Sequence, residues 1–209
     1  MKKIVLGMFI IIALVSSSVA SQKSGCVLAQ KGKVTVAWKA YKTPLKKGVS
    51  GVFNSVKYLG VSKEGKNFRE ILVGSSVSID TSSVNSKNEG RDAKLIKFFF
   101  KKMANQVIEA KIIDIKADKK LKGKPRTGLI TLNITMNGIT KVVPMKYNFS
   151  KGVFSANGVI DILDFSALNA LSSINKACYE LHDGKTWSDV NIAFSTHIEA
   201  ILCNVKPLK

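Results

Sequence analysis

The feature that most constrains this chain is a set of short runs in which apolar and polar residues alternate. In the run at residues 129–136, Ile130, Leu132 and Ile134 fall on one side and polar residues lie between them. A period of two is typical of a β-strand that buries one face. The chain is therefore expected to build its core mainly from strands.

A hairpin signal follows this run directly. Asn137 and Gly138 both tolerate positive φ, and Asn-Gly between two alternating runs is the strongest short-range indication of a two-residue β-turn. The return run at residues 140–149 again has its apolar residues on one face, namely Val143, Met145, Tyr147 and Phe149. The two runs predict an antiparallel hairpin.

Six further runs have strand character and two segments have helical spacing. The strand runs are residues 34–41, 51–58, 68–79, 107–115, 154–163 and 190–202. Helices are predicted at Asp92–Met103, with Asp92 as the N-terminal cap, and at Phe165–Cys178. Eight antiparallel strands joined by turns predict a mainly β fold, a single closed or nearly closed barrel with one or two short helices.

The first twenty residues have the pattern of a secretory signal peptide. Lys2 and Lys3 precede a twelve-residue apolar run, and Ser18 and Ala20 suit cleavage after Ala20. The run is short for a membrane span, which needs ~20 apolar residues, although an uncleaved anchor stays open as an alternative. We expect a mature domain of residues 21–209 in a bacterial periplasm.

The chain is strongly basic. It has 33 Lys and Arg against 14 Asp and Glu, and loss of the two lysines of the leader lowers the formal charge from +19 to +17. Such a charge favours anionic partners, and we expect peripheral contact with anionic membrane. Nucleic acid is excluded because of export and because the lysines are scattered without interleaved aromatic residues. A basic surface that only maintains solubility is the alternative.

Several motifs together resemble the YceI-like family. They are the segment Ser78–Ser83 (SIDTSS), Arg91 and Asp92 followed by Leu95 and the pair Phe98–Phe99, and the hairpin from Gly128 to Lys141. The resemblance extends from about Lys33 to Leu202. The sequence departs from the family pattern at Trp38–Tyr41, at Lys94 and in the insertion Cys178–Trp187. We therefore expect a divergent member of the family.

The resemblance implies a lipocalin-like barrel, usually periplasmic, that holds an isoprenoid, a quinone-like molecule or another amphipathic lipid in its lumen. The inward faces then provide the ligand-binding residues: Trp38, Ile130, Leu132, Ile134, Met145, Tyr147, Phe149, Ile192 and Phe194. The alternative is that these side chains pack against one another as a solid core. Arg91 and Asp92 either meet a polar head group at the mouth or form a helix cap and turn contact.

Three cysteines in an oxidising compartment suggest one disulfide and one free thiol. In an up-and-down barrel the last strand pairs with the first, so we expect a bond between Cys26 and Cys203, with Cys178 as the rival partner of either. His182, Asp183 and Cys178 are too few and too poorly spaced to predict a metal site. No metal and no cofactor other than a bound lipid is expected.

The sequence thus predicts a monomeric or homodimeric lipid-binding protein for storage, transport or sequestration, without catalytic residues. An enzyme that uses the same cavity is one alternative, but the inward faces offer it only Tyr147 and Thr196 as polar groups. A secreted structural or interaction protein with a solid core is the other.

Overall fold

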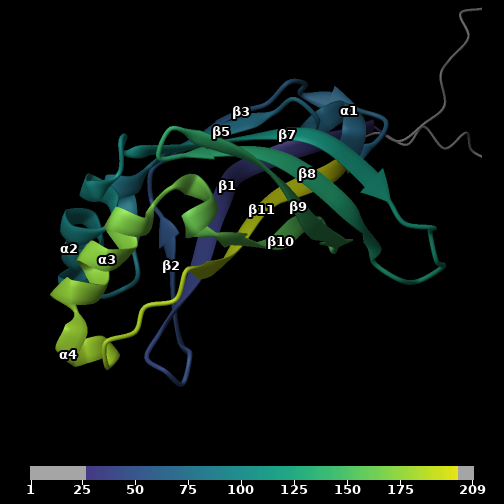
Figure 1. Ribbon diagram of the computed structural model, residues 1–209. Coiled ribbons are helices and arrows are strands. Elements are labelled where there is room, and N and C mark those ends of the chain that lie inside the picture. The colour runs from purple at the N-terminus through teal and green to yellow at the C-terminus, as the bar shows by residue number, and fades with distance from the viewer. Residues whose placement is uncertain (1–26, 202–209) are drawn as a thin grey trace, which may run out of the picture.

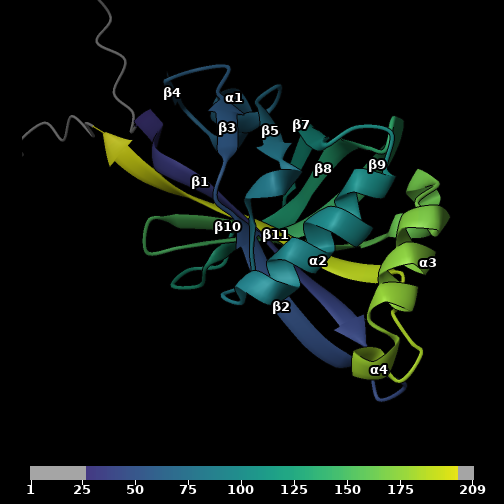
Figure 2. The ribbon, with the colours of Figure 1, turned by 90° about the vertical axis from the view of Figure 1, so that its left-hand side faces the viewer.

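The alternating runs of the sequence form the strands of one curled antiparallel sheet (Figures 1 and 2). The structure, a computed structural model, describes residues 27–201. The strand order is β3-β5-β7-β8-β9-β10-β11-β1-β2-β6, and β4 pairs with β1. The fold is therefore mainly β and antiparallel, as predicted.

The strands are β1 Val27–Lys42, β2 Lys47–Phe53, β3 Val56–Leu59, β4 Glu64–Gly65, β5 Ser76–Asp80, β6 Val84–Asn85, β7 Val107–Ala117, β8 Arg126–Met136, β9 Ile139–Ser150, β10 Val153–Asp161 and β11 Asp189–Ile201. The α-helices are α1 Phe68–Leu72, α2 Glu89–Phe98, α3 Leu168–Ala177 and α4 Tyr179–His182. Three short 3₁₀ turns are η1 Thr81–Ser83, η2 Phe100–Lys102 and η3 Ile162–Phe165.

The predicted hairpin at Asn137 and Gly138 is confirmed. Both residues have positive φ, 52° and 77°, and Met136 pairs with Ile139 across the turn. The side-chain amide of Asn137 donates to the carbonyl oxygen of Phe165, so this turn also anchors η3. The inward faces of β8 and β9 are buried as the alternation predicts.

The structure has eleven strands where the sequence predicts eight. The run predicted at residues 51–58 breaks at Asn54 and Ser55, so that β2 pairs with β1 while β3 pairs with β5. The two-residue strands β4 and β6 supply the other two additions. Because β2 and β3 belong to opposite ends of the strand order, this bent segment brings those ends together and gives the sheet its barrel-like curl.

The strand predicted at residues 68–79 is wrong in its first half, which forms α1. Asn67 caps this helix through its side chain, which accepts from the Glu70 amide, while the Glu70 carboxylate accepts from the Lys66 amide. These reciprocal bonds satisfy two backbone amides that, in a strand, would need a neighbouring strand as their hydrogen-bond partner. Helical spacing then buries the apolar residues Phe68, Ile71 and Leu72.

The predicted cap of α2 is also wrong. The cap is Asn88, four residues before Asp92, and its side chain accepts from the Arg91 amide at 2.8 Å; α2 itself begins at Glu89. Asp92 instead accepts from the backbone and hydroxyl of Ser86, at 3.0 and 2.5 Å. Asn caps as well as Asp does, and Asp92 is already engaged by the chain that precedes the helix.

The helices α2, α3 and α4 cover one end of the curled sheet, and α1 lies at the opposite end (Figures 1 and 2). The β1–β2 hairpin lies beside the segment that follows α4, because the Thr43 amide donates to the Lys185 carbonyl and the Trp187 indole donates to the Thr43 carbonyl. The helical end of the sheet is thus enclosed by three helices and one strand hairpin.

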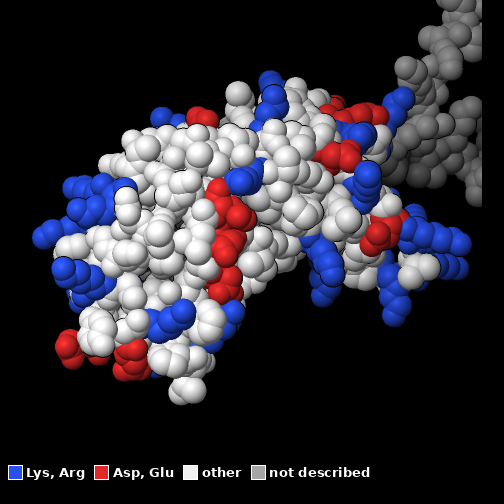
Figure 3. Space-filling model, viewed as in Figure 1, with Lys and Arg blue, Asp and Glu red and all other residues white. Residues whose placement is uncertain are grey.

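Basic side chains gather toward the two ends of the face drawn in Figure 3, with a short column of acidic residues between them. One basic group is the exposed loop between β7 and β8, which carries Lys119, Lys120, Lys122 and Lys124. Within residues 27–201, no helix is both long enough and apolar enough to cross a bilayer.

Candidate functional site

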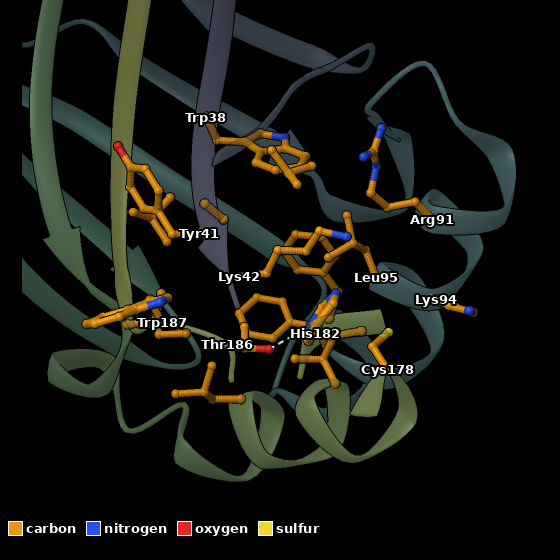
Figure 4. A pocket seen from close by; sticks show the side chains of 18 of the residues that line it. Trp38, Tyr41, Lys42, Arg91, Lys94, Leu95, Cys178, His182, Thr186 and Trp187 are labelled. Carbon is orange, nitrogen blue, oxygen red and sulfur yellow. Dashed lines mark hydrogen bonds between the residues drawn. The ribbon is translucent and has the colours of Figure 1, made fainter. Parts of the chain in front are cut away.

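The interior of the curled sheet is filled at one end and hollow at the other. A cavity of about 430 Å³ lies between the sheet and the helices α2, α3 and α4 (Figure 4). A narrower apolar cavity of about 110 Å³ continues between the sheet strands. Trp38 and Ile192 line both cavities and therefore mark where they meet.

The structure places six of the nine predicted lumen residues on these cavities. Trp38 and Ile192 line both, and four others line the narrower one: Leu132, Ile134, Met145 and Phe194. The remaining three, Ile130, Tyr147 and Phe149, line neither cavity, and Tyr147 and Phe149 pack on Phe68 of α1. The predicted lumen residues thus belong partly to two adjoining cavities and partly to a filled core.

A cluster of aromatic rings fills the α1 end. Phe68 of α1 packs edge-to-face on Tyr147, Phe149 and Phe154, with ring centroids 5.0–6.0 Å apart. Tyr147 and Phe154 are stacked at 4.9 Å. Edge-to-face and offset contacts at these distances are the favoured packing of aromatic rings, so this end has the solid core of the alternative interpretation.

The wall of the larger cavity is built from two kinds of element. The strands contribute inward-facing residues, with Trp38 and Ala40 on β1 and Ile192 on β11. The helices contribute residues three or four positions apart, which share one helix face. These are Leu95 and Phe99 from α2 and its end, and Leu171, Ile174 and Cys178 from α3 and its end.

The position of Trp38 depends on Gly51, its partner across the β1–β2 ladder. A Cβ atom at Gly51 would lie 2.5 Å from the Trp38 ring and 2.7 Å from the Asn85 carbonyl oxygen. The indole therefore lies over the glycine. Its Nε1 is buried and has no hydrogen-bond partner in the described part of the chain.

The larger cavity is polar near the hairpin and α4. Four basic side chains line it, and no Asp or Glu is among its lining residues: the four are Lys42, Arg91, Lys94 and His182. Lys42 follows Trp38 and Ala40 at the strand period, which places it on the inward face of β1. The cavity thus combines apolar walls with basic residues from β1, α2 and α4.

His182 is held by a short hydrogen-bond chain. Thr186 Oγ1 donates to the side-chain oxygen Oδ1 of Asn175 at 3.2 Å, so the Thr186 oxygen accepts from His182 Nδ1 at 2.9 Å. This fixes the proton of the neutral ring on Nδ1 and leaves Nε2 as the acceptor. Burial lowers the pKa of His182, and the charges of Lys42 and Lys94 lower it further against the opposing effect of Asp183.

Arg91 and Asp92 both bind Ser86, which precedes α2. Arg91 donates from Nε to the Ser86 hydroxyl at 2.7 Å and from its guanidinium to the Ser86 carbonyl at 2.9 Å. Arg91 also lines the larger cavity, whereas Asp92 does not. The pair therefore fixes the start of α2 against β6, and only Arg91 also faces the cavity.

The predicted disulfide partners Cys26 and Cys203 lie outside the described residues. The strands that lead to them pair at their outer ends, with Val27 opposite Ile201. Cys178 is buried with a free thiol and lies in the wall of the larger cavity.

Thr196 accepts a hydrogen bond from Gln30 at 2.7 Å and lines the narrower cavity. Residues 27–201 hold no group of three or more metal-ligand side chains.

Sequence reasoning missed Lys42 and the aromatic residues of the α2 end as site residues. Lys42 was detectable, because it is in phase with Trp38 and Ala40. Phe99 and Phe100 were not, since their position over the sheet follows from how α2 docks rather than from a local pattern.

A family model of the YceI-like domain matches residues 27–198. The chain belongs to the YceI-like family. Comparison with curated proteins gives no match. The similar solved structures described next are 13–21% identical to this YceI-like chain, so they support the fold alone.

The polyisoprenoid-binding domain from Saccharophagus degradans has a TM-score of 0.54 at 13% identity, covering 83% of this chain and 98% of its own. BcnA of Burkholderia cenocepacia has a TM-score of 0.50 at 14% identity, with 79% and 96% covered. A mutant YceI protein from Campylobacter jejuni has a TM-score of 0.51 at 21% identity, with 75% and 86% covered. The curled sheet described above is therefore the sheet of this family.

Proposed function

We propose that this protein binds one amphipathic lipid, with an isoprenoid or similar long apolar chain, in the cavity between the sheet and helices α2, α3 and α4. The observation that carries the proposal is the cavity itself, about 430 Å³ with predominantly apolar walls and a few basic side chains among them. Small-molecule sites typically measure ~300–1,000 Å³ and have this lining.

The energetics favour a chain-like ligand. Each methylene group removed from water contributes ~0.8 kcal/mol, so a lipid tail binds strongly in an apolar cavity without many polar contacts. The narrower cavity of about 110 Å³ adjoins the larger one at Trp38 and Ile192 and offers further apolar surface. The solved relative described as a polyisoprenoid-binding domain supports the same class of ligand.

The proposal places the protein in the periplasm after removal of residues 1–20, where it stores, transports or sequesters its lipid. The leader pattern of the sequence supports this location. The proposal includes no covalent chemistry, and Tyr147, one of the two polar groups considered for an enzyme, lies in the filled aromatic end.

Native mass spectrometry of the mature protein tests the proposal. We expect a stoichiometric adduct of several hundred daltons that organic solvent releases. Where the purified protein carries no adduct, incubation with isoprenoid quinones, prenyl phosphates and fatty acids should restore one. A polypeptide mass that stays bare after all these incubations would show that the cavity holds no lipid.

A cavity-filling variant localises the adduct. Ala40→Phe adds a ring to the cavity wall and should reduce the adduct strongly, because the wall residue is inward-facing. Lys39→Phe adds the same ring to the exposed outer face of the same strand and should leave the adduct unchanged. Equal loss in both variants would place the lipid elsewhere.

A further inference from the structure

The larger cavity has an unbalanced charge. Its lining contains Lys42, Arg91, Lys94 and His182 and no carboxylate. The ion pairs among residues 27–201 are Lys46 with Asp189 and Arg69 with Asp114, so neither Lys42 nor Lys94 has a carboxylate partner there. Arg91 is satisfied by Ser86, and the Lys94 ammonium group points away from the cavity (Figure 4), which leaves Lys42 as the available charge.

Lys42 is the lysine best placed to meet a ligand. It is half-buried on the inward face of β1, and its ammonium group points into the cavity between Trp38 and His182 (Figure 4). Its neighbour across the β1–β2 ladder is Lys47, another cation. Like charges opposite each other destabilise a strand pair, and a partly desolvated ammonium needs an anion or hydrogen-bond acceptors.

We propose that the lipid bound here carries an anionic head group, a carboxylate or a phosphate, and that Lys42 is its principal ionic partner. This inference rests on the proposed function and narrows its ligand class. The Trp38 indole, whose buried N–H has no acceptor within residues 27–201, supplies a second donor at the cavity wall.

The electrostatics of His182 agree with this assignment. Burial lowers the pKa of His182, and the charges of Lys42 and Lys94 lower it further. Asp183 opposes this effect, but it is exposed and does not line the cavity. Because its pKa is lowered from 6.5, the ring is mostly uncharged at pH 8, so the positive charge offered to a ligand comes from Lys42 rather than from His182.

Matched ligands with one tail and three head groups test the inference. Hexadecanoic acid, hexadecyl phosphate and hexadecanol are titrated by isothermal calorimetry at pH 8, where His182 is neutral. A hydrogen bond to a charged group contributes roughly ten-fold or more in affinity. We therefore expect the phosphate or the carboxylate to bind about ten-fold more tightly than the alcohol, and the stronger of the two identifies the head-group class.

Substitution of Lys42 tests whether this lysine causes the preference for an anionic head group. Lys42→Met keeps the aliphatic stem and removes the charge, so it should reduce this preference to within about three-fold while Lys42→Arg retains it. Lys39→Met removes the same charge from the exposed outer face of β1 and should leave the preference intact. Circular dichroism and thermal melting establish that each variant is folded.

The outcomes separate the two proposals. Equal affinity for the alcohol and both anions, or the same result for Lys42→Met and Lys39→Met, overturns the assignment of an anionic head group but leaves lipid binding intact. Absence of binding for all three ligands and for the longer isoprenoid probes overturns the proposed function itself. An unfolded Lys42→Met variant leaves the comparison of head groups on the unmodified protein as the deciding measurement.

Discussion

Tyr147 shows how one side chain combines good packing with an unpaired polar atom. Its ring stacks on Phe154, but its hydroxyl is buried and has no hydrogen-bond partner in the described residues. Burial raises the pKa of Tyr147, Arg126 opposes this effect, and Asp118 adds to it. A buried hydroxyl without a partner costs about 1–3 kcal/mol.

Removal of that hydroxyl should therefore stabilise the protein. We expect Tyr147→Phe to maintain or increase the free energy of unfolding, by up to about 1 kcal/mol, in urea denaturation. Tyr41→Phe is the matched control and should lower it, because the Tyr41 hydroxyl donates to Asn191 at 2.5 Å. A clear destabilisation by Tyr147→Phe would mean that its hydroxyl has a bonding partner.

The sequence predicts single side chains well where a local pattern determines them. Met145 and Ile134 face inward because their strands alternate. Asp92 is a failure of the same reasoning, since Asn88 and Asp92 both suit a cap and only the contact of Asp92 with Ser86 decides between them. That contact depends on tertiary structure.

At the scale of elements, the pairing of β1 with β2 positions the junction between the two cavities. Trp38 lies opposite Gly51, and its ring occupies the space that a side chain there would take. Gly51 also lies against the Asn85 carbonyl of β6, a backbone atom that cannot move aside easily. The β2 strand therefore requires a glycine at this position.

Gly51→Ala should displace the Trp38 ring and disturb both cavities. Overpacking of this kind costs about 1–3 kcal/mol, so we expect a lower melting temperature and weaker binding of hexadecanoic acid. Gly48→Ala on the same strand should have little effect, because its Cβ would meet only the flexible end of Lys39. Equal effects of the two substitutions would show that Gly51 is not needed to make room for the Trp38 ring.

Elements were predicted least well where tertiary packing competes with local preference. Residues 68–79 are rich in residues that suit a strand, yet the reciprocal bonds of Asn67 and Glu70 favour a helix, and that helix places Phe68 in the aromatic cluster. The closure of the cavity by α2 and α3 has no local sequence signal. It follows from the position of both helices over one end of the sheet (Figure 2).

At the scale of the whole molecule, one exposed loop concentrates positive charge. The β7–β8 loop carries four exposed lysines and the exposed apolar residue Leu121. Each lysine near an anionic bilayer contributes about 1 kcal/mol of attraction. We propose this loop as the principal contact for peripheral membrane binding.

Vesicle sedimentation tests this contact. Binding to vesicles that contain phosphatidylglycerol should weaken as salt rises, since screening shortens the reach of surface charges. Replacing Lys119, Lys120, Lys122 and Lys124 by Gln should abolish it. The matched control replaces four scattered exposed lysines, namely Lys31, Lys33, Lys57 and Lys63. Binding that is insensitive to salt, or lost equally in both variants, would rule out the loop.

The pairing of β1 with β11 makes the sheet depend on both ends of the described chain. Val27 lies opposite Ile201, and the ladder continues to Lys39 opposite Asn191. Contacts between residues so distant in sequence form late and slow the folding of β proteins. The sheet therefore cannot be completed until the chain has been synthesised through β11, whatever the order in which its other strands form.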